Sequence, residues 1–412
     1  MSLRMSILKK KLVDEVGSLR EELVELTRAL VAIPSENPPG DEAGVSEKVG
    51  GELRALGFEV EFVEPDPRRV STLGTLKGSG GGRNFLYNGH YDTVPIGNLE
   101  FWSVDPYKGV VKDGKIYGRG TGDMKSSIAA AIIAARALQN VGVKLKGDFM
   151  IHAVADEETG SSHGTKYLVE NGYEAADNVD MAVVGEGSVY KDRIHVRTAV
   201  RGAHWLKITT RGRSAHASRP EAGVNAVLHM CRILLALSEH KFKFTKHELL
   251  PDPSISAGTI IKGGVKENVI PEMCEATCDL RVIPGMTREE TLGEIRGVFD
   301  SLKKEDPSID ARVETIYWWP PSETPISEDI FKVAGKAAQE VAGYELTSRG
   351  TSGSNDTSWL KNIAGIPTVA FGPGDNYKSG AHGPDEWVSI ERLVDFAKIY
   401  GLMAMDICGV DE

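Results

Sequence analysis

Apolar residues recur every three or four positions in several stretches of the chain, which is the spacing of one face of an α-helix. The first stretch covers about residues 6–32 and ends at a proline-rich loop, residues 34–40. The other predicted helices cover about residues 41–56, 126–138, 223–240 and 287–305. The pattern therefore predicts five helices, the last of which ends at about residue 305.

Short apolar stretches between these helices predict β-strands. They lie at about residues 58–63, 85–87, 149–155, 181–184 and 366–371. Residues 110–117 have the pattern of a hairpin that turns at Asp113-Gly114. Apolar strands that alternate with helices are typical of an α/β sheet buried on both faces.

The middle of the chain has a different order of elements. Its strands are expected at about residues 204–210, 254–261, 274–282 and 311–316. With the two intervening helices they give the β-α-β-β-α-β order of a ferredoxin-like α+β domain. Trp318-Trp319-Pro320-Pro321 is expected to return the chain to the first sheet. We therefore predict a split α/β domain, residues 1–193 and 318–412, with a mixed, mostly parallel sheet between helices, and an inserted domain at residues 194–317.

Composition and charge narrow the class of protein. The 412 residues are 41% apolar and 26% charged, which is typical of a globular chain long enough for two or three domains. The net charge of −11 argues against nucleic acid or an anionic membrane as the main partner. No apolar run reaches the roughly 18 residues of a membrane-spanning helix, and the N-terminus does not have the pattern of a signal peptide. We therefore expect a cytoplasmic protein.

The chain has only four cysteines, which is too few for a disulfide framework. Cys274 and Cys278 lie in a predicted strand and lack a second cysteine pair, so we expect buried free thiols there and no zinc site.

Acidic residues and histidines follow several of the predicted strands. They are His90, Asp92, Glu157, Glu158, Glu186 and His382. Sites in α/β sheets gather beyond the carboxyl ends of the strands, where these groups would meet. Asp123 precedes a helix instead, where an alternative role is to cap that helix. For His90 and Asp92, which share one face of an extended chain, the alternative is an ordinary turn with an exposed histidine.

Two imidazoles and several carboxylates in one crevice repel or titrate unless a metal ion binds them. This mixture of ligands suits zinc, and also cobalt or manganese. One aspartate can bridge two ions about 3.5–4 Å apart. A carboxylate that is not a ligand would then carry the proton from water to the leaving amine. Asp156-Glu157-Glu158 offers one ligand and one such base, and spacing does not say which glutamate is which.

Four segments of the chain together resemble the M20 metallopeptidase family, which includes acetylornithine deacetylase, succinyl-diaminopimelate desuccinylase, aminoacylase and glutamate carboxypeptidase. The segments are residues 89–95 (GHYDTVP), 118–125 (GRGTGDMK), 156–160 (DEETG) and 380–386 (GAHGPDE). The resemblance implies two zinc ions per subunit, with cobalt or manganese as substitutes. One ion would be held by His90, Asp123 and Glu186, and the other by Asp123, Glu158 and His382. Glu157 would be the general acid and base, and Asp92 would orient His90.

The inserted region resembles the dimerisation domain of the same family. The resemblance implies that His216, in the segment GRSAHA at residues 212–217, reaches the site of a partner subunit and supports the oxyanion. Asn268 and Arg281 would grip the carboxylate of the substrate, although an arginine on a strand is otherwise most often a surface residue. The loop at residues 352–356 either lines the acyl pocket or is an ordinary solvated loop. One departure from the family is Lys125-Ser126-Ser127, where relatives commonly have glycines, and we expect it to affect helix packing.

The resemblance implies a homodimeric dinuclear zinc amidohydrolase that removes an N-acyl group from an amino acid, of the acetylornithine deacetylase or succinyl-diaminopimelate desuccinylase type. In the family a metal-bound water attacks the amide and a glutamate is the general base. A metallo-carboxypeptidase or dipeptidase that cleaves a short peptide is the alternative within the family. An acyl-amino-acid binding protein without activity is the alternative from another class.

Overall fold

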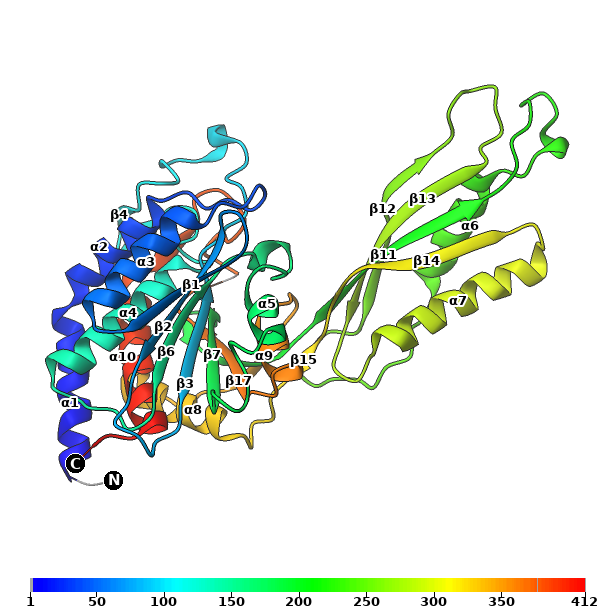
Figure 1. Ribbon diagram of the computed structural model, residues 1–412. Coiled ribbons are helices and arrows are strands. Elements are labelled where there is room, and N and C mark those ends of the chain that lie inside the picture. Colours follow the sequence, from blue (N-terminus) through cyan, green and yellow to red (C-terminus); the bar gives the residue numbers. More distant parts are fainter. Residues whose placement is uncertain (1–2, 376, 412) are drawn as a thin grey trace. The chain divides into compact units, whose positions relative to one another are not determined.

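The computed structural model describes residues 3–375 and 377–411 and divides into two compact units (Figure 1). The first unit comprises Met1–Thr198, Thr324–Arg349 and Asn355–Glu412, and the second comprises Ala199–Glu323 and Gly350–Ser354. The two main boundaries lie a few residues C-terminal to the predicted ones, and residues 350–354, which were predicted in the split domain, belong to the second unit. Trp318 and Trp319 still belong to strand β14 (Asp310–Trp319) of the second unit, and the chain joins the first sheet directly after Pro320-Pro321, at Ser322–Glu323.

The first unit contains a large mixed sheet. Its strands follow the order β1 (Glu59–Asp66), β2 (Arg69–Leu76), β6 (Phe149–Val154), β3 (Phe85–His90), β7 (Met181–Gly187), β17 (Thr368–Gly372) and β10 (Val196–Val200). The central strands β6, β3, β7 and β17 are parallel to one another, whereas β1, β2 and β10 pair in antiparallel fashion. The predicted mixed sheet with a parallel centre is confirmed.

The register of the central strands determines which loops meet. Asn88 of β3 pairs with His152 of β6 on one side and with Val184 of β7 on the other. His90 therefore ends its strand beside Val154, just before the loop that contains Glu157, and close to the end of β7, which contains Glu186. Parallel strands end at the same edge of a sheet, so these loops converge there.

Helices cover both faces of this sheet, with α4 and α10 on one face and α5 and α9 on the other (Figure 1). The helices of the first unit are α1 (Leu3–Ser18), α2 (Arg20–Val31), α3 (Ala43–Ala55), α4 (Lys125–Asn140), α5 (Thr165–Glu170), α8 (Asp329–Ala342), α9 (Thr357–Asn362) and α10 (Ile390–Cys408). The helix predicted across residues 6–32 is two helices that separate at Leu19. Gly17 precedes this break, and a glycine loses more conformational freedom in a helix than other residues do.

The remaining short elements are distributed over the two units, and those at residues 220–222 and 322–323 belong to the second unit. They are β4 (Val110–Lys112), β5 (Lys115–Tyr117), β8 (Val189–Tyr190), β9 (Arg193–Ile194), β15 (Ser322–Glu323), β16 (Ser348–Thr351), β18 (Trp387–Ser389) and the 3₁₀ helices η1 (Leu99–Phe101), η2 (Glu157–Thr159) and η3 (Pro220–Ala222). The predicted hairpin at β4 and β5 is confirmed, because Asp113 and Gly114 both have the positive φ of a tight hairpin turn.

The second unit is a ferredoxin-like domain, as predicted. Its elements are β11 (Gly202–Arg211), α6 (Ala226–Glu239), β12 (Ser254–Gly263), β13 (Met273–Val282), α7 (Arg288–Glu305) and β14. They form an antiparallel sheet in the order β12-β13-β11-β14, and α7 begins at a capping box between Thr287 and Glu290. Cys274 and Cys278 are buried free thiols, also as predicted. In neither unit is any described helix long and apolar enough to cross a membrane.

A chain of buried hydroxyl groups ties α4 and α10 to the sheet of the first unit. The Tyr87 hydroxyl donates to Ser127 Oγ over 2.8 Å, and Tyr400 donates to the carbonyl of Phe371 over 2.7 Å. Ser127 Oγ lies 2.9 Å from the Tyr400 hydroxyl, so the serine is the donor between them. Ser127 therefore takes part in the packing of α4 against the sheet and α10, and its departure from the family stays a prediction.

We expect Ser127→Ala to lower the free energy of unfolding by about 1–3 kcal/mol, because the buried Tyr87 hydroxyl loses its acceptor. The double variant Tyr87→Phe/Ser127→Ala should lose clearly less than the sum of the two single variants, since no buried donor is then left unpaired. Urea denaturation of the four proteins measures this coupling. Ser162→Ala, at an exposed serine, is the control and should change the free energy by less than about 0.5 kcal/mol. Strict additivity would contradict this role for Ser127.

Candidate metal centre

Five of the predicted site residues converge at the carboxyl edge of the central sheet. His90 Nε2 lies 3.1 Å from Asp123 Oδ1 and 3.4 Å from Glu186 Oε1. His382, in the loop between β17 and β18, has its Nε2 atom 3.3 Å from Asp123 Oδ2 and 3.3 Å from Glu158 Oε2. Segments that are nearly 300 residues apart in sequence thus place imidazole and carboxylate groups in one cluster.

Asp123 is the centre of this cluster, because each of its carboxylate oxygens faces a different histidine. The alternative that Asp123 caps α4 is wrong: the residue in the cap position is Met124, and no side chain caps the helix. A carboxylate held between two imidazoles has the arrangement of a ligand that bridges two ions.

Asp92 holds both His90 and the backbone of the two neighbouring glutamates. His90 Nδ1 lies 3.0 Å from the carbonyl oxygen of Asp92 and 3.5 Å from its Oδ1. The N–H groups of Glu157 and Glu158 each donate to the Asp92 carboxylate over 3.1 Å. His90 is only 1% exposed, so the alternative of a turn with an exposed histidine is wrong. By holding Nδ1, Asp92 directs the Nε2 atom of the His90 ring toward Asp123.

Asp156 precedes the two glutamates but points away from the cluster. Its backbone has a φ of +66°, and its carboxylate accepts hydrogen bonds from Arg69, Asn37 and the N–H of His163. Asn37 also donates to Asp92 over 2.9 Å. Sequence reasoning did not identify Asn37 or Arg69, because both come from segments without a motif and reach the site only through the fold.

The histidines of the cluster bind protons tightly when no metal is present. Hydrogen bonds to Asp123 and Glu158 raise the pKa of His382 to about 11. Burial opposes the charged form of His90, but hydrogen bonds to Asp123, Asp92 and Glu186 outweigh it and raise the pKa well above its ordinary value. Burial also opposes the charge of Asp123, yet the two histidines hold its pKa below the ordinary value. Without a metal ion, the charge of these carboxylates is therefore balanced by protons on the two histidines.

The two adjacent glutamates are buried among like charges. Burial, with the charges of Glu186 and Glu158 in addition, raises the pKa of Glu157 well above its ordinary value, although His90 opposes the rise. Burial likewise raises the pKa of Glu158 to about 7, against the hydrogen bond from His382. Burial lowers the pKa of the nearby Arg197 on β10, while the charges of Glu186 and Asp123 oppose that change. Sequence reasoning did not identify Arg197.

The side chains present fit a metal ion. The ligand atoms of His90, Asp123 and Glu158 lie within 4.8 Å of one another, and so do those of His90, Glu157 and Glu186. Glu158 Oε1 is buried and has no hydrogen-bond partner among the described residues. A buried carboxylate oxygen without a donor is costly unless it binds a cation. The set of imidazole nitrogens and carboxylate oxygens suits zinc, cobalt or manganese.

The remaining predicted site residues lie in the second unit, at opposite ends of its sheet. His216 pairs with Val269, so the loops that contain His216 and Asn268 lie side by side next to the start of β13. Arg281 lies near the other end of β13 and pairs with Asp279 over 2.9 Å. A strand rises about 3.4 Å per residue, so the eight steps of β13 from Met273 to Arg281 place Arg281 roughly 27 Å from the end of the sheet at which His216 and Asn268 lie.

The polar loop at residues 352–356 is only partly an ordinary solvated loop. Its last residue, Asp356, is buried in the first unit and accepts hydrogen bonds from the hydroxyls of Ser161 over 2.5 Å and Thr165 over 2.7 Å. Ser161 follows shortly after the two glutamates, so Asp356 helps to hold the loop that contains them. That this loop lines the acyl pocket stays a prediction.

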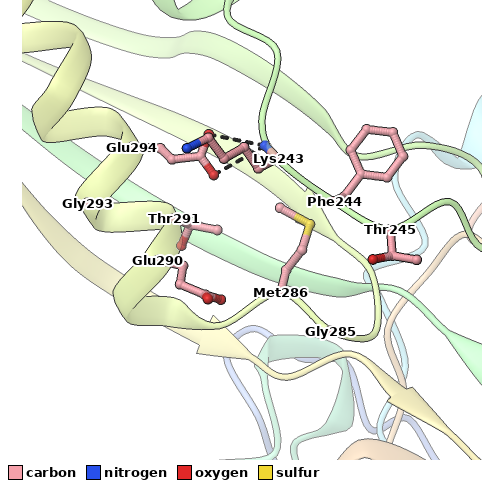
Figure 2. A pocket seen from close by; sticks show the side chains of 9 residues that line it. All are labelled: Lys243, Phe244, Thr245, Gly285, Met286, Glu290, Thr291, Gly293 and Glu294. Atoms are coloured by element: carbon pink, nitrogen blue, oxygen red, sulfur yellow. Dashed lines mark hydrogen bonds between the residues drawn. The ribbon is translucent and has the colours of Figure 1, made fainter.

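A separate pocket of about 700 Å³ lies in the second unit (Figure 2). It is lined by Lys243, Phe244, Thr245, Gly285, Met286, Glu290, Thr291, Gly293 and Glu294. The carboxylate of Glu294 accepts the backbone N–H of Lys243 and lies 3.0 Å from His240 Nε2, so it holds the segment after α6. This pocket contains none of the predicted site residues.

Comparisons with known proteins agree with this geometry. The model of peptidase family M20/M25/M40 matches residues 86–406. The chain is 28% identical to N-formyl-4-amino-5-aminomethyl-2-methylpyrimidine deformylase of Bacillus subtilis, over 93% of this chain and 94% of that one. It is 27% identical to succinyl-diaminopimelate desuccinylase of Pelagibacter ubique, over 92% and 96%. A dinuclear metal-binding M20 peptidase of Bacillus subtilis shares the fold, with a TM-score of 0.71 and 17% identity over 96% and 100% of the two chains. The chain therefore belongs to peptidase family M20/M25/M40, and it is a metal-dependent hydrolase of amide bonds.

Proposed function

We propose that this hydrolase removes the N-acyl group from a small acylated amino acid, with two zinc ions bound in each subunit. The observation that carries the proposal is the Asp123 carboxylate, whose two oxygens face His90 and His382. His90, Asp123 and Glu186 would hold one ion, and Asp123, Glu158 and His382 the other. When bound, such ions polarise the amide carbonyl and the attacking water.

The position of Glu157 and its affinity for protons support the role of general base. Its Oε2 atom lies 4.0 Å from His90 Nε2, farther than the ligand contacts of Asp123 and Glu186 with that ring. Burial favours its protonated form, so Glu157 would take a proton from water and give it to the nitrogen of the leaving amine. Asp92 fixes the backbone of Glu157 and thereby the direction of its carboxylate.

An exposed apolar surface on the second unit supports assembly as a homodimer. Leu228 and Leu235 lie seven residues apart on α6, and Ile260 and Ile261 lie on β12, and all of them are exposed. β12 is also an edge strand of its sheet. An exposed edge strand beside apolar side chains is suited to pair with the same strand of a second copy about a two-fold axis.

The separation within the second unit supports a site shared between two subunits. Residues roughly 27 Å apart on one rigid sheet do not reach the same small substrate. Arg281 of one subunit would therefore act together with His216 and Asn268 of the other. Arg281 would pair with the substrate carboxylate in exchange for part of its contact with Asp279.

The substrate class is the direct test of the proposal. The zinc-loaded protein should be assayed with N-acetylornithine, N-succinyl-diaminopimelate and a set of dipeptides. It should also be assayed with N-formyl-4-amino-5-aminomethyl-2-methylpyrimidine, the compound in the name of the Bacillus subtilis relative. We expect hydrolysis of an acylated amino acid, loss of all activity on chelation, and recovery with zinc or cobalt. Preferential hydrolysis of dipeptides would make the protein a peptidase of the same family. Full activity of protein shown to be metal-free by elemental analysis would contradict the metal centre, and folded zinc-loaded protein without any activity would favour a binding protein.

Zinc content measured beside kcat separates the two adjacent glutamates. Glu157→Gln keeps the shape of the side chain but cannot accept a proton, so it should retain both ions while kcat falls by about 10²–10⁴-fold or more. Glu158→Ala removes an anionic ligand and should lose metal. Glu170→Gln, at an exposed residue of α5, is the control and should change neither quantity. Zinc-poor Glu157→Gln together with Glu158→Ala that keeps two ions would reverse the roles.

Mixing of inactive variants tests the shared site. Glu157→Gln or Arg281→Ala, mixed with His216→Ala, should recover about a quarter of wild-type activity, because about half of randomly exchanged dimers are hybrids with one intact site. His216→Ala mixed with Asn268→Ala should recover nothing, since both residues would serve the same neighbouring site. Subunit exchange is verified by mass-tagged chains. No recovery in any mixture despite exchange would show that each site is built within one subunit.

A further inference from the structure

Glu386 is a buried carboxylate in the same cluster of loops, and it accepts hydrogen bonds from backbone N–H groups and Arg119. Its Oε1 atom accepts the N–H groups of Gly122 over 2.7 Å and Asp123 over 3.0 Å. Its Oε2 atom accepts the N–H of Gly120 over 3.1 Å and Arg119 Nη1 over 2.6 Å. Glu386 is 1% exposed, so these donors replace water completely.

The backbone turn at residues 120–123 directs three N–H groups at one carboxylate. Gly120 has a φ of +81°, a conformation that favours glycine, and it turns the backbone so that successive N–H groups point at one spot. A Cβ atom on Gly122 would lie only 3.0 Å from Ser379 Oγ and 3.4 Å from Glu386 Oε1. The spacing of glycines before Asp123 therefore has a physical reason: it lets the backbone approach Glu386.

Glu386 also joins two segments that are far apart in sequence. β18 pairs with β5, so Trp387 lies opposite Tyr117, and the N–H of Gly118 donates to the carbonyl of Glu386 over 2.8 Å. The N–H of Trp387 donates to the carbonyl of Ser379 over 2.9 Å and closes the loop that contains His382. One residue thus fixes the loop that ends at Asp123 and the base of the loop that contains His382.

We propose that Glu386 is a positioning residue for the metal centre, which holds Asp123 and His382 in the arrangement that binds metal before any ion arrives. Arg119, which is 2% exposed, balances the charge of Glu386 and also donates to the carbonyl of Pro95 over 3.3 Å. Partners that orient metal ligands typically change metal affinity by about 10–100-fold when they are removed. The proposal uses metal binding alone and does not depend on the identity of the substrate.

Zinc affinity of the metal-free protein, measured by competition with a chromophoric chelator, tests this role. Glu386→Gln keeps the volume but replaces one acceptor by an NH₂ group that faces a donor. We expect its affinity for zinc to fall by about 10–100-fold. A saturating excess of zinc should restore kcat to within a few-fold of wild type, because Glu386 contacts neither substrate nor ion.

The matched control is Asp395→Asn, which removes a carboxylate paired with Arg392 over 2.8 Å on α10. This variant should bind zinc as the wild type does. Equal loss of zinc affinity in both variants would mean a general loss of stability and would overturn the proposal. Wild-type zinc affinity in folded Glu386→Gln would overturn it as well.

A second variant covers the case in which Glu386→Gln does not fold. Glu386→Asp keeps the charge beside Arg119 but is one methylene shorter, so it cannot reach all of the N–H donors at once. Folded Glu386→Asp should bind zinc at least several-fold more weakly than the wild type. Unchanged affinity, or failure of both variants to fold, would assign Glu386 to the fold alone and reject the positioning role.

Discussion

Charge balance among buried carboxylates is the constraint on which this site depends. Asp92, Asp123, Asp156, Glu157, Glu158, Glu186 and Glu386 all lie at one edge of the central sheet or in the loops beside it. Each would be costly to bury without donors or positive charge. How each carboxylate is compensated separates the residues that build the site from those that would bind metal.

The scaffold carboxylates are compensated within the protein. Asp92 accepts hydrogen bonds from two backbone N–H groups and from Asn37, and Asp156 accepts one from Arg69. Glu386 accepts hydrogen bonds from three backbone N–H groups and from Arg119. The carboxylates proposed to act on metal or on protons face imidazoles and one another instead, and Glu158 Oε1 faces no donor among the described residues. The first group is held rigidly, while the second group is stable only with protons or with metal ions.

The role proposed for the second unit rests on its shape. A ferredoxin-like sheet places His216 and Asn268 at one end and Arg281 at the other. In the proposed homodimer a second copy would supply the groups at the far end of the sheet, and the exposed leucines of α6 and isoleucines of β12 would offer the surface for it. Relatives named as a deformylase and a desuccinylase are similar to this chain over almost its full length, so similarity over the whole chain does not determine the substrate.

The hydrophobic pattern of the sequence was sufficient for the α/β sheet, the ferredoxin-like insert and the hairpin at Asp113-Gly114, because these depend on periodicity and local turn chemistry. It missed β2, whose buried residues Ser71 and Thr72 do not alternate with apolar ones, and it missed the break at Leu19. Motifs brought out His90, Asp123, the glutamate pair, Glu186 and His382 as candidates. Only the tertiary structure identified Asn37, Arg69 and Glu386 as their supports. Their role depends on hydrogen bonds across as many as 267 residues, and no local pattern in a sequence records such distant contacts.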